Sequence, residues 1–158
     1  MRTRQTNRSR GLTLLEVIIT MTVVGIMVAA AMPIARTVTQ RQKEIDLRRA
    51  LREIRQGVDA YKNACEARLI SDLDRNVDDL CYPPTLEILV EGITPPNRTD
   101  KIRFLRRIPE DPMTGTTKWG KRSIQDEEDS SSWGGQNVFD VYSNVDGTAL
   151  DGTRYKTW

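Results

Sequence analysis

A long apolar run near the start of the chain limits its possible folds more than any other feature. Residues 12–32 read LTLLEVIITMTVVGIMVAAAM and contain one charged side chain, that of Glu16. Because a helix needs about 20 apolar residues to span the hydrocarbon core of a bilayer, we predict a membrane-inserting helix here. The positive-inside rule keeps the arginines ahead of this run in the cytoplasm and sends the rest of the chain outward; these are Arg2, Arg4, Arg8 and Arg10.

A secretory signal peptide is the alternative interpretation of this run. Signal peptides also combine a basic start, an apolar middle and small residues near a cleavage site, here residues 29–31 (AAA). Glu16 argues against this alternative, because a carboxylate at full membrane depth opposes insertion by about 3 kcal/mol and gains nothing in a discarded segment. We therefore favour a helix that is retained.

Cleavage after Gly11 would give Glu16 a purpose. A cut at this point creates a new α-amine on Leu12, which a neighbouring copy could offer to the carboxylate. A buried carboxylate is tolerated where a counter-charge and hydrogen bonds replace its water. If helices of many copies stack with an offset of four residues, about 6 Å, Glu16 of one copy meets Leu12 of the next. The single charge then sets the register of an assembly.

Two further residues bear on the same helix. Pro33 has no backbone N–H and clashes with the preceding turn, so we expect it to kink or locally open the helix. Gly25 weakens the same stretch. The alternative is that both are ordinary residues of a membrane helix, in which Gly and Pro are common.

Composition excludes several classes of function. Four of the 24 basic residues precede Gly11, which leaves 20 against 22 acidic residues, so the rest of the chain has no basic excess for binding nucleic acid. There is no histidine, which removes histidine general bases and most zinc sites. No phosphate-binding glycine loop or GxSxG nucleophile motif is present. We therefore expect the chain not to be an enzyme.

An amphipathic pattern follows the apolar run. Six residues recur at alternating steps of four and three and predict one helical face, Leu47, Leu51, Ile54, Val58, Tyr61 and Cys65. The opposite face is charged, with Glu44 to Arg48 as a supporting i,i+4 pair. We predict one helix from about Leu12 to near Leu69, with the apolar face packed against a head. A coiled-coil seam is the alternative, although the pattern is short for one.

The second half of the chain predicts a small head. Residues 85–92 (TLEILVEG) predict a short helix, and residues 118–124 and 138–143 are the best strand candidates, forming an antiparallel sheet against the long helix. Cys65 and Cys81 could form a disulfide worth about 3 kcal/mol in an oxidising compartment, the alternative being two free buried thiols. We expect packing roles for at least two of the tryptophans and a solvated loop at residues 126–129; the tryptophans are Trp119, Trp133 and Trp158.

The sequence around Gly11 resembles a known processing signal. The stretch GLTLLE followed by a long apolar helix is similar to the class III signal of type IV pilins and type II secretion pseudopilins. In that family a prepilin peptidase cuts after the glycine and methylates the new N-terminus, and the fifth mature residue is Glu, here Glu16. Leu12 stands where Phe or Met is usual. The resemblance also implies that Gly25 and Pro33 flank a segment that extends on filament formation.

The head resembles one branch of this family. YPPTLEILVEG, IPEDPMTG, FDVYSNVDG and the final Trp158 are similar to the head of the major pseudopilin of type II secretion. This implies an α+β, pilin-like fold, a long N-terminal helix packed by a small antiparallel sheet. It also implies calcium in the last loop, for which Ser143, Asp146 and Asp151 are the oxygen donors present. Two tight Asp-Gly turns are the alternative interpretation of that loop.

The resemblance implies a role and a place in the cell. We expect a leader at 1–11, a transmembrane and filament-core helix at 12–35, its amphipathic continuation at 36–70 and a periplasmic head at 71–158. The expected function is a pseudopilus subunit, first in membrane lipid of the bacterial inner membrane and then in a periplasmic homo-oligomeric filament. Its implied partners are the prepilin peptidase, the assembly platform and minor pseudopilins. The alternatives are a type IV pilin of a surface fibre and a membrane-anchored binding domain that never polymerises.

Overall fold

The computed structural model describes residues 13–70, 79–96, 99–127, 130 and 132–158, and it leaves the side chains of residues 30–35 undescribed. Gly11 and Leu12 lie outside these residues. The chain divides into two compact units, residues 1–39 and 40–158. In the first unit, residues 13–29, whose side chains are described, form the stem. The second unit is the head unit.

One helix, α1 (Leu14–Glu66), accounts for 53 residues and confirms the long helix predicted from the sequence. It continues through Gly25 and Pro33, so the helix does not open at Pro33, and a kink there stays a prediction. A proline removes a single backbone hydrogen bond, and the residues on either side keep their helical conformation. Among the described residues, no helix has the length and apolar character that crossing a membrane requires.

The core of the head unit forms on the predicted face of α1. All six residues of the predicted apolar stripe are buried, and Leu47 and Ile54 have no exposed surface. They pack against Leu89, Val138 and Val141 from the second half of the chain. Burying side chains of this size stabilises a fold by about 1.5–3 kcal/mol each. The stripe is therefore the face that carries the head, and the coiled-coil alternative is wrong.

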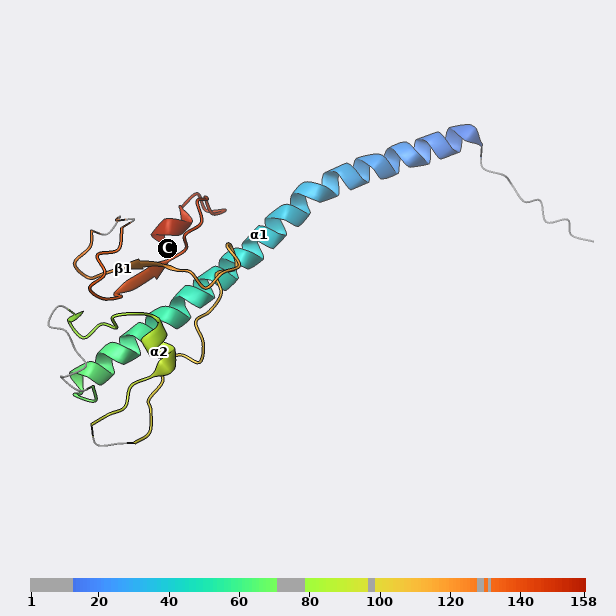
Figure 1. Cartoon of the computed structure of the whole chain (residues 1–158). Coiled ribbons are helices and arrows are strands. Elements are labelled where there is room, and N and C mark those ends of the chain that lie inside the picture. The colour runs from blue at the N-terminus through green and yellow to red at the C-terminus, as the bar shows by residue number, and fades with distance from the viewer. Residues whose placement is uncertain (1–12, 71–78, 97–98, 128–129, 131) are drawn as a thin grey trace, which may run out of the picture. The chain divides into compact units, whose positions relative to one another are not determined.

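The other elements of the head unit lie along the second half of α1 (Figure 1). The short helix α2 (Glu87–Glu91) confirms the predicted helix and ends at Gly92, where φ is 78°. The strands β1 (Gly120–Arg122) and β2 (Asp140–Tyr142) pair antiparallel, with Gly120 opposite Tyr142. A 3-10 turn, η3 (Tyr155–Thr157), follows near the end of the sequence. The fold is α+β, consistent with the pilin-like expectation.

Both strands lie inside the predicted segments and are shorter than predicted. Asn137 explains where β1 stops, because its side-chain oxygen accepts a hydrogen bond from the backbone N–H of Ile124 at 3.1 Å. Its main-chain oxygen accepts one from the Ser123 hydroxyl at 2.9 Å. Side-chain groups thus take over the hydrogen bonds that would have extended the ladder.

The end of α1 is joined to the following loop by a disulfide. Cys65 and Cys81 are bonded, with their Cα atoms 5.5 Å apart, which is the pairing favoured from the sequence. Leu80 and Cys81 have φ values of 48° and 66°, in the left-handed region that side chains rarely adopt. The bridge fixes this tight approach to the helix.

Two tryptophans pack within the head unit. Trp119 is buried, and its indole N–H donates to the main-chain oxygen of Pro109 at 2.9 Å. Trp133 is half-buried and donates to the main-chain oxygen of Asn137 at 2.8 Å. The packing role predicted for at least two tryptophans is confirmed.

Candidate functional site

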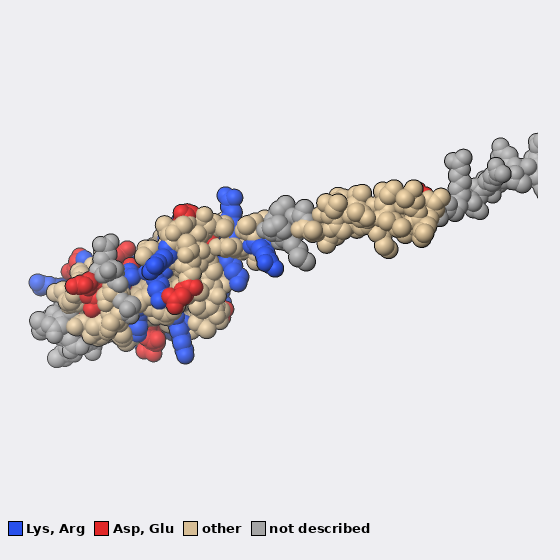
Figure 2. All heavy atoms as spheres, turned by 90° about the horizontal axis from the view of Figure 1, so that it is seen from above, with Lys and Arg blue, Asp and Glu red and all other residues tan. Residues whose placement is uncertain are grey.

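The stem exposes apolar side chains in every direction. Apart from the half-buried Val17, its large hydrophobic residues range from 51% exposed at Val23 to 79% at Leu14. Figure 2 shows this part of α1 as a nearly uncharged surface, whereas charges of both signs cover the head unit. A helix that is apolar on all sides is unsuited to water and is normally buried in lipid or among other helices. The stem therefore requires a partner surface.

Glu16 is the one charged residue of the stem and lies in the first turn of α1. A carboxylate in this position interacts favourably with the helix dipole, by about 0.3–1 kcal/mol. The hydroxyl groups of Thr20 and Thr22 donate to main-chain oxygens of their own helix, at 3.0 and 2.8 Å. Within the described residues the Glu16 carboxylate has no such partner, so it is available for an external cation.

The predicted partner of Glu16 is the amine of Leu12, which lies outside the described residues. Gly25 is described, and a Cβ placed on it would meet nothing within 4 Å. Packing inside the chain therefore does not require a glycine at this position. Its small size becomes useful only where another helix comes close.

Comparison with known families agrees with this geometry at the N-terminus. Residues 6–32 match the prokaryotic N-terminal methylation motif. The methylation motif is typical of type IV pilin-like proteins, and it includes Gly11, Leu12, Glu16 and Gly25. No significant match to the chain was found among curated proteins or among solved structures. The methylation motif thus supports a pilin-like subunit in general.

The three residues predicted to bind calcium face different partners. The Ser143 hydroxyl donates to Asp111 at 2.6 Å, and both side chains are fully buried. Asp146 accepts from the ammonium group of Lys156 at 2.6 Å. Asp151 accepts from the guanidinium group of Arg48 at 2.9 Å. The part of the chain that the structure describes holds no cluster of three or more metal-ligating acidic, cysteine or histidine residues. As arranged here, the three donors do not fit one calcium site.

The acidity of both aspartates reflects these contacts. The hydrogen bond from Lys156 lowers the pKa of Asp146, and the charge of the ammonium group adds to this effect. Hydrogen bonds from the Thr153 hydroxyl and backbone N–H lower the pKa of Asp151, to which Arg48 also contributes. Both carboxylates are thereby held in their charged form.

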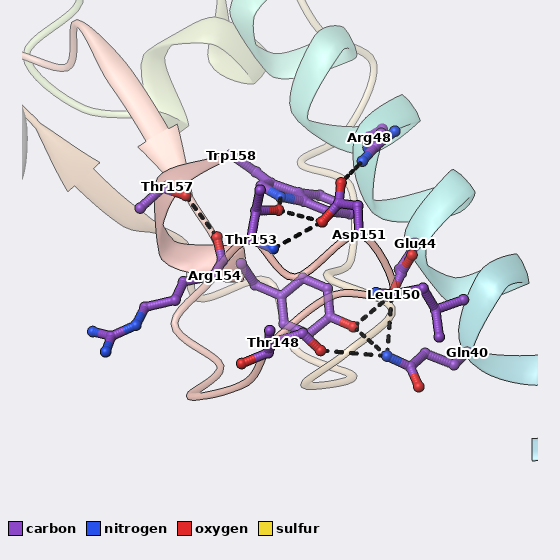
Figure 3. A network of polar contacts seen from close by, with 11 residues as sticks. Gln40, Glu44, Arg48, Thr148, Leu150, Asp151, Thr153, Arg154, Thr157 and Trp158 are labelled. Carbon is purple, nitrogen blue, oxygen red and sulfur yellow. Dashed lines mark hydrogen bonds and ion pairs between the residues drawn. The ribbon is translucent and has the colours of Figure 1, made fainter. Parts of the chain in front are cut away.

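A buried carboxylate connects α1 to the end of the chain (Figure 3). Glu44 is 8% exposed, and one of its oxygens accepts hydrogen bonds from the Leu150 N–H, the Tyr155 hydroxyl and the Gln40 amide, at 2.9, 2.9 and 3.1 Å. Burial raises the pKa of Tyr155, against the effect of a hydrogen bond from Gln40. The predicted Glu44–Arg48 pair is wrong, because Glu44 accepts hydrogen bonds from the last segment of the chain, whereas Arg48 pairs with Asp151.

Arg48 and Trp158 close the same network. The guanidinium carbon of Arg48 lies 4.1 Å from the centroid of the Trp158 ring, a cation–π contact. The indole N–H of Trp158 donates to the Thr153 hydroxyl at 2.6 Å, and Arg55 donates to the main-chain oxygen of Trp158 at 2.8 Å. Figure 3 shows Arg48 and Asp151 in contact next to Trp158. From the sequence, Arg48 was expected on the charged face of the helix as a partner of Glu44, and its contact with Trp158 was not predicted.

Proposed function

We propose that this protein is the structural subunit of a type II secretion pseudopilus. The observation that carries the proposal is the stem, a helix that exposes apolar side chains on all sides inside a prokaryotic N-terminal methylation motif. Its one carboxylate has no partner among the residues that the structure describes. Such a surface suits lipid before assembly and a bundle of identical helices afterwards. The subunit itself catalyses nothing.

In the proposed mechanism the chain is held in the inner membrane with its head in the periplasm. A prepilin peptidase cuts after Gly11 and methylates Leu12, and an assembly platform with minor pseudopilins starts the fibre. Glu16 of one copy then pairs with the amine of Leu12 on the next, at an offset of about 6 Å. A buried ion pair is worth little in stability, but breaking it leaves a buried charge unpaired, so it specifies the register.

Resemblance in the head supports the secretion branch over a surface pilus. The FDVYSNVDG segment, which has β2 near its start, and the final Trp158 follow the pattern of major pseudopilins. The fibre would push folded proteins through an outer-membrane channel. A type IV pilin of a surface fibre is the second candidate, because the methylation motif supports it equally.

Intact-mass analysis of the protein purified from its native membrane tests the proposal. We expect a chain that begins at Leu12 and carries one added methyl group. A start near Met32 would instead identify a cleaved signal peptide, and an uncut chain would identify an anchored domain that does not polymerise. To separate the two fibre candidates, the gene is deleted: loss of exported proteins from the medium supports the pseudopilus, and loss of surface fibres with normal export supports the pilin.

A further inference from the structure

We propose that the C-terminal loop of the head unit, residues 144–158, is closed by two of the chain's own cations, Arg48 and Lys156, so that the head folds without calcium. The inference concerns the head unit alone and stands independently of the proposed function. It starts from contacts that hold the two acidic residues of this loop.

Lys156 closes the loop on itself. Its ammonium group lies 2.6 Å from the carboxylate of Asp146, which joins the turn η3 to the beginning of the loop. An isolated antiparallel bridge between Thr148 and Arg154 lies inside the loop, two positions in from each residue of this ion pair. An exposed ion pair adds little to stability by itself. We therefore expect the Lys156–Asp146 pair to stabilise the loop together with the backbone bridge.

Arg48 ties the loop to the helix. Its guanidinium group contacts Asp151 at 2.9 Å and stacks on the Trp158 ring at 4.1 Å. Thr153 links these two residues, since its hydroxyl donates to Asp151 and accepts from Trp158, both at 2.6 Å. One side chain from α1 thus fixes a carboxylate and an aromatic ring that lie seven positions apart in the sequence.

A bound calcium ion would have to displace these contacts. Calcium takes six to eight oxygen ligands around one point, whereas the donors of this loop are directed to separate places. The buried Ser143 hydroxyl donates to Asp111 and accepts from the Val145 N–H. Asp146 and Asp151 already face positive groups. A divalent ion entering here would be repelled by the ammonium and guanidinium groups unless both left. The resident cations therefore take the charge-neutralising role that a metal has in a calcium loop.

The test measures the melting temperature of the full-length protein in detergent, with calcium, with a chelator and with magnesium as the control for ionic strength. We expect the three values to agree within about 1 °C. A calcium site filled to about 100 times its Kd would raise the Tm by roughly 10 °C for a unit of this size. Such a rise with calcium alone would overturn the inference.

Matched variants test the two cations directly. Arg48→Met removes the ion pair with Asp151 and the contact with the Trp158 ring. Its control is Arg52→Met, which removes an exposed arginine one turn further along α1. The half-buried Lys156 is replaced by Met, and Lys118→Met, at an exposed position, is its control. We expect Arg48→Met and Lys156→Met to have a lower Tm than their controls, by several degrees for Arg48 and by less for Lys156. Equal melting within either pair would overturn the role of that cation.

Two further measurements keep the test decisive if Arg48→Met does not fold. Arg48→Lys keeps the charge and loses the planar contact with the indole, so we expect an intermediate Tm. Raising the NaCl concentration from low to high is expected to lower the Tm of the native protein more than that of Lys156→Met, because salt screens the pair with Asp146. A salt response that is the same in both proteins would contradict the inference.

Discussion

Gly57 on α1 faces Leu105 so closely that a Cβ on the glycine would lie 2.8 Å from the Leu105 Cγ. Leu105 is 6% exposed, so it has little room to withdraw. The absence of a side chain at this position lets the segment that follows α2 reach the helix backbone. This contact leads to the first prediction.

Substitution of Gly57 by Val is expected to destabilise the head unit by about 1–3 kcal/mol through overpacking. Ala at this position is expected to be nearly neutral, because its gain in helix propensity of about 1 kcal/mol offsets a smaller displacement of Leu105. Urea unfolding measures both. The control is Ala60→Val, at an exposed position of the same helix. If the Gly57 and Ala60 valine variants lose the same stability, the close approach is unimportant.

Replacement of Glu16 by Gln is expected to leave membrane insertion intact and to abolish or strongly reduce fibre formation. The amide keeps the shape of the side chain and loses the charge that would hold the Leu12 amine of a neighbour. Electron microscopy of sheared fibres and pelleting assays measure assembly. Glu53→Gln, on the exposed face of α1, is the control and should assemble normally. Normal fibres from the Glu16 variant would refute the pairing.

Reduction of the Cys65–Cys81 disulfide is expected to destabilise the head unit by about 3 kcal/mol, because it frees the loop of residues 66–80 in the unfolded chain. Urea unfolding with and without a thiol reductant measures the loss. The Cys65→Ser, Cys81→Ser double variant should be insensitive to the reductant. An unchanged midpoint in the reduced native protein would show that the bridge adds no stability.

The buried Tyr155 is expected to make the head unit less stable at alkaline pH. Its pKa is raised in the folded state by burial, so the unfolded chain ionises first, near pH 10. The contribution of Tyr155 is therefore complete below about pH 10 and is lost as the pH rises toward the folded pKa. Unfolding between pH 9 and pH 11 is compared with that of Tyr155→Phe. The two proteins differ only in this phenol, so the variant should show the shallower decline. Parallel curves would contradict the buried-phenol explanation.

Local patterns predicted the parts of the fold that depend on local physics. The four-and-three spacing from Leu47 to Cys65 identified the buried face of α1, since a helix places residues at that spacing on one side. Aromatic and β-branched residues located β2, but the strand length depended on Asn137, whose competing hydrogen bonds have no signature in composition. The disulfide followed from two cysteines and a short loop, with the free-thiol alternative left open.

The candidate sites divided in the same way. The lone carboxylate and the glycine at the leader boundary are read from a contiguous motif, and they could be predicted. The partners of Asp146 and Asp151 could not. Asp151 meets Arg48, which lies more than 100 positions earlier, and no local rule selects one arginine among several on a helix face. The i,i+4 rule paired Glu44 with Arg48 because it considers only the helix itself, whereas the folded loop offers both residues other partners.

Gln40, Glu44 and Arg48 follow one another at steps of four along α1, and all three contact the last segment of the chain. Each helical residue advances the direction of a side chain by about 100°. One extra residue between Gln40 and Arg48 would thus rotate part of this row away from its contacts, whereas an insertion ahead of Gln40 would lengthen the helix and leave the row in phase. Changes in helix length should therefore be tolerated on one side of Gln40 only.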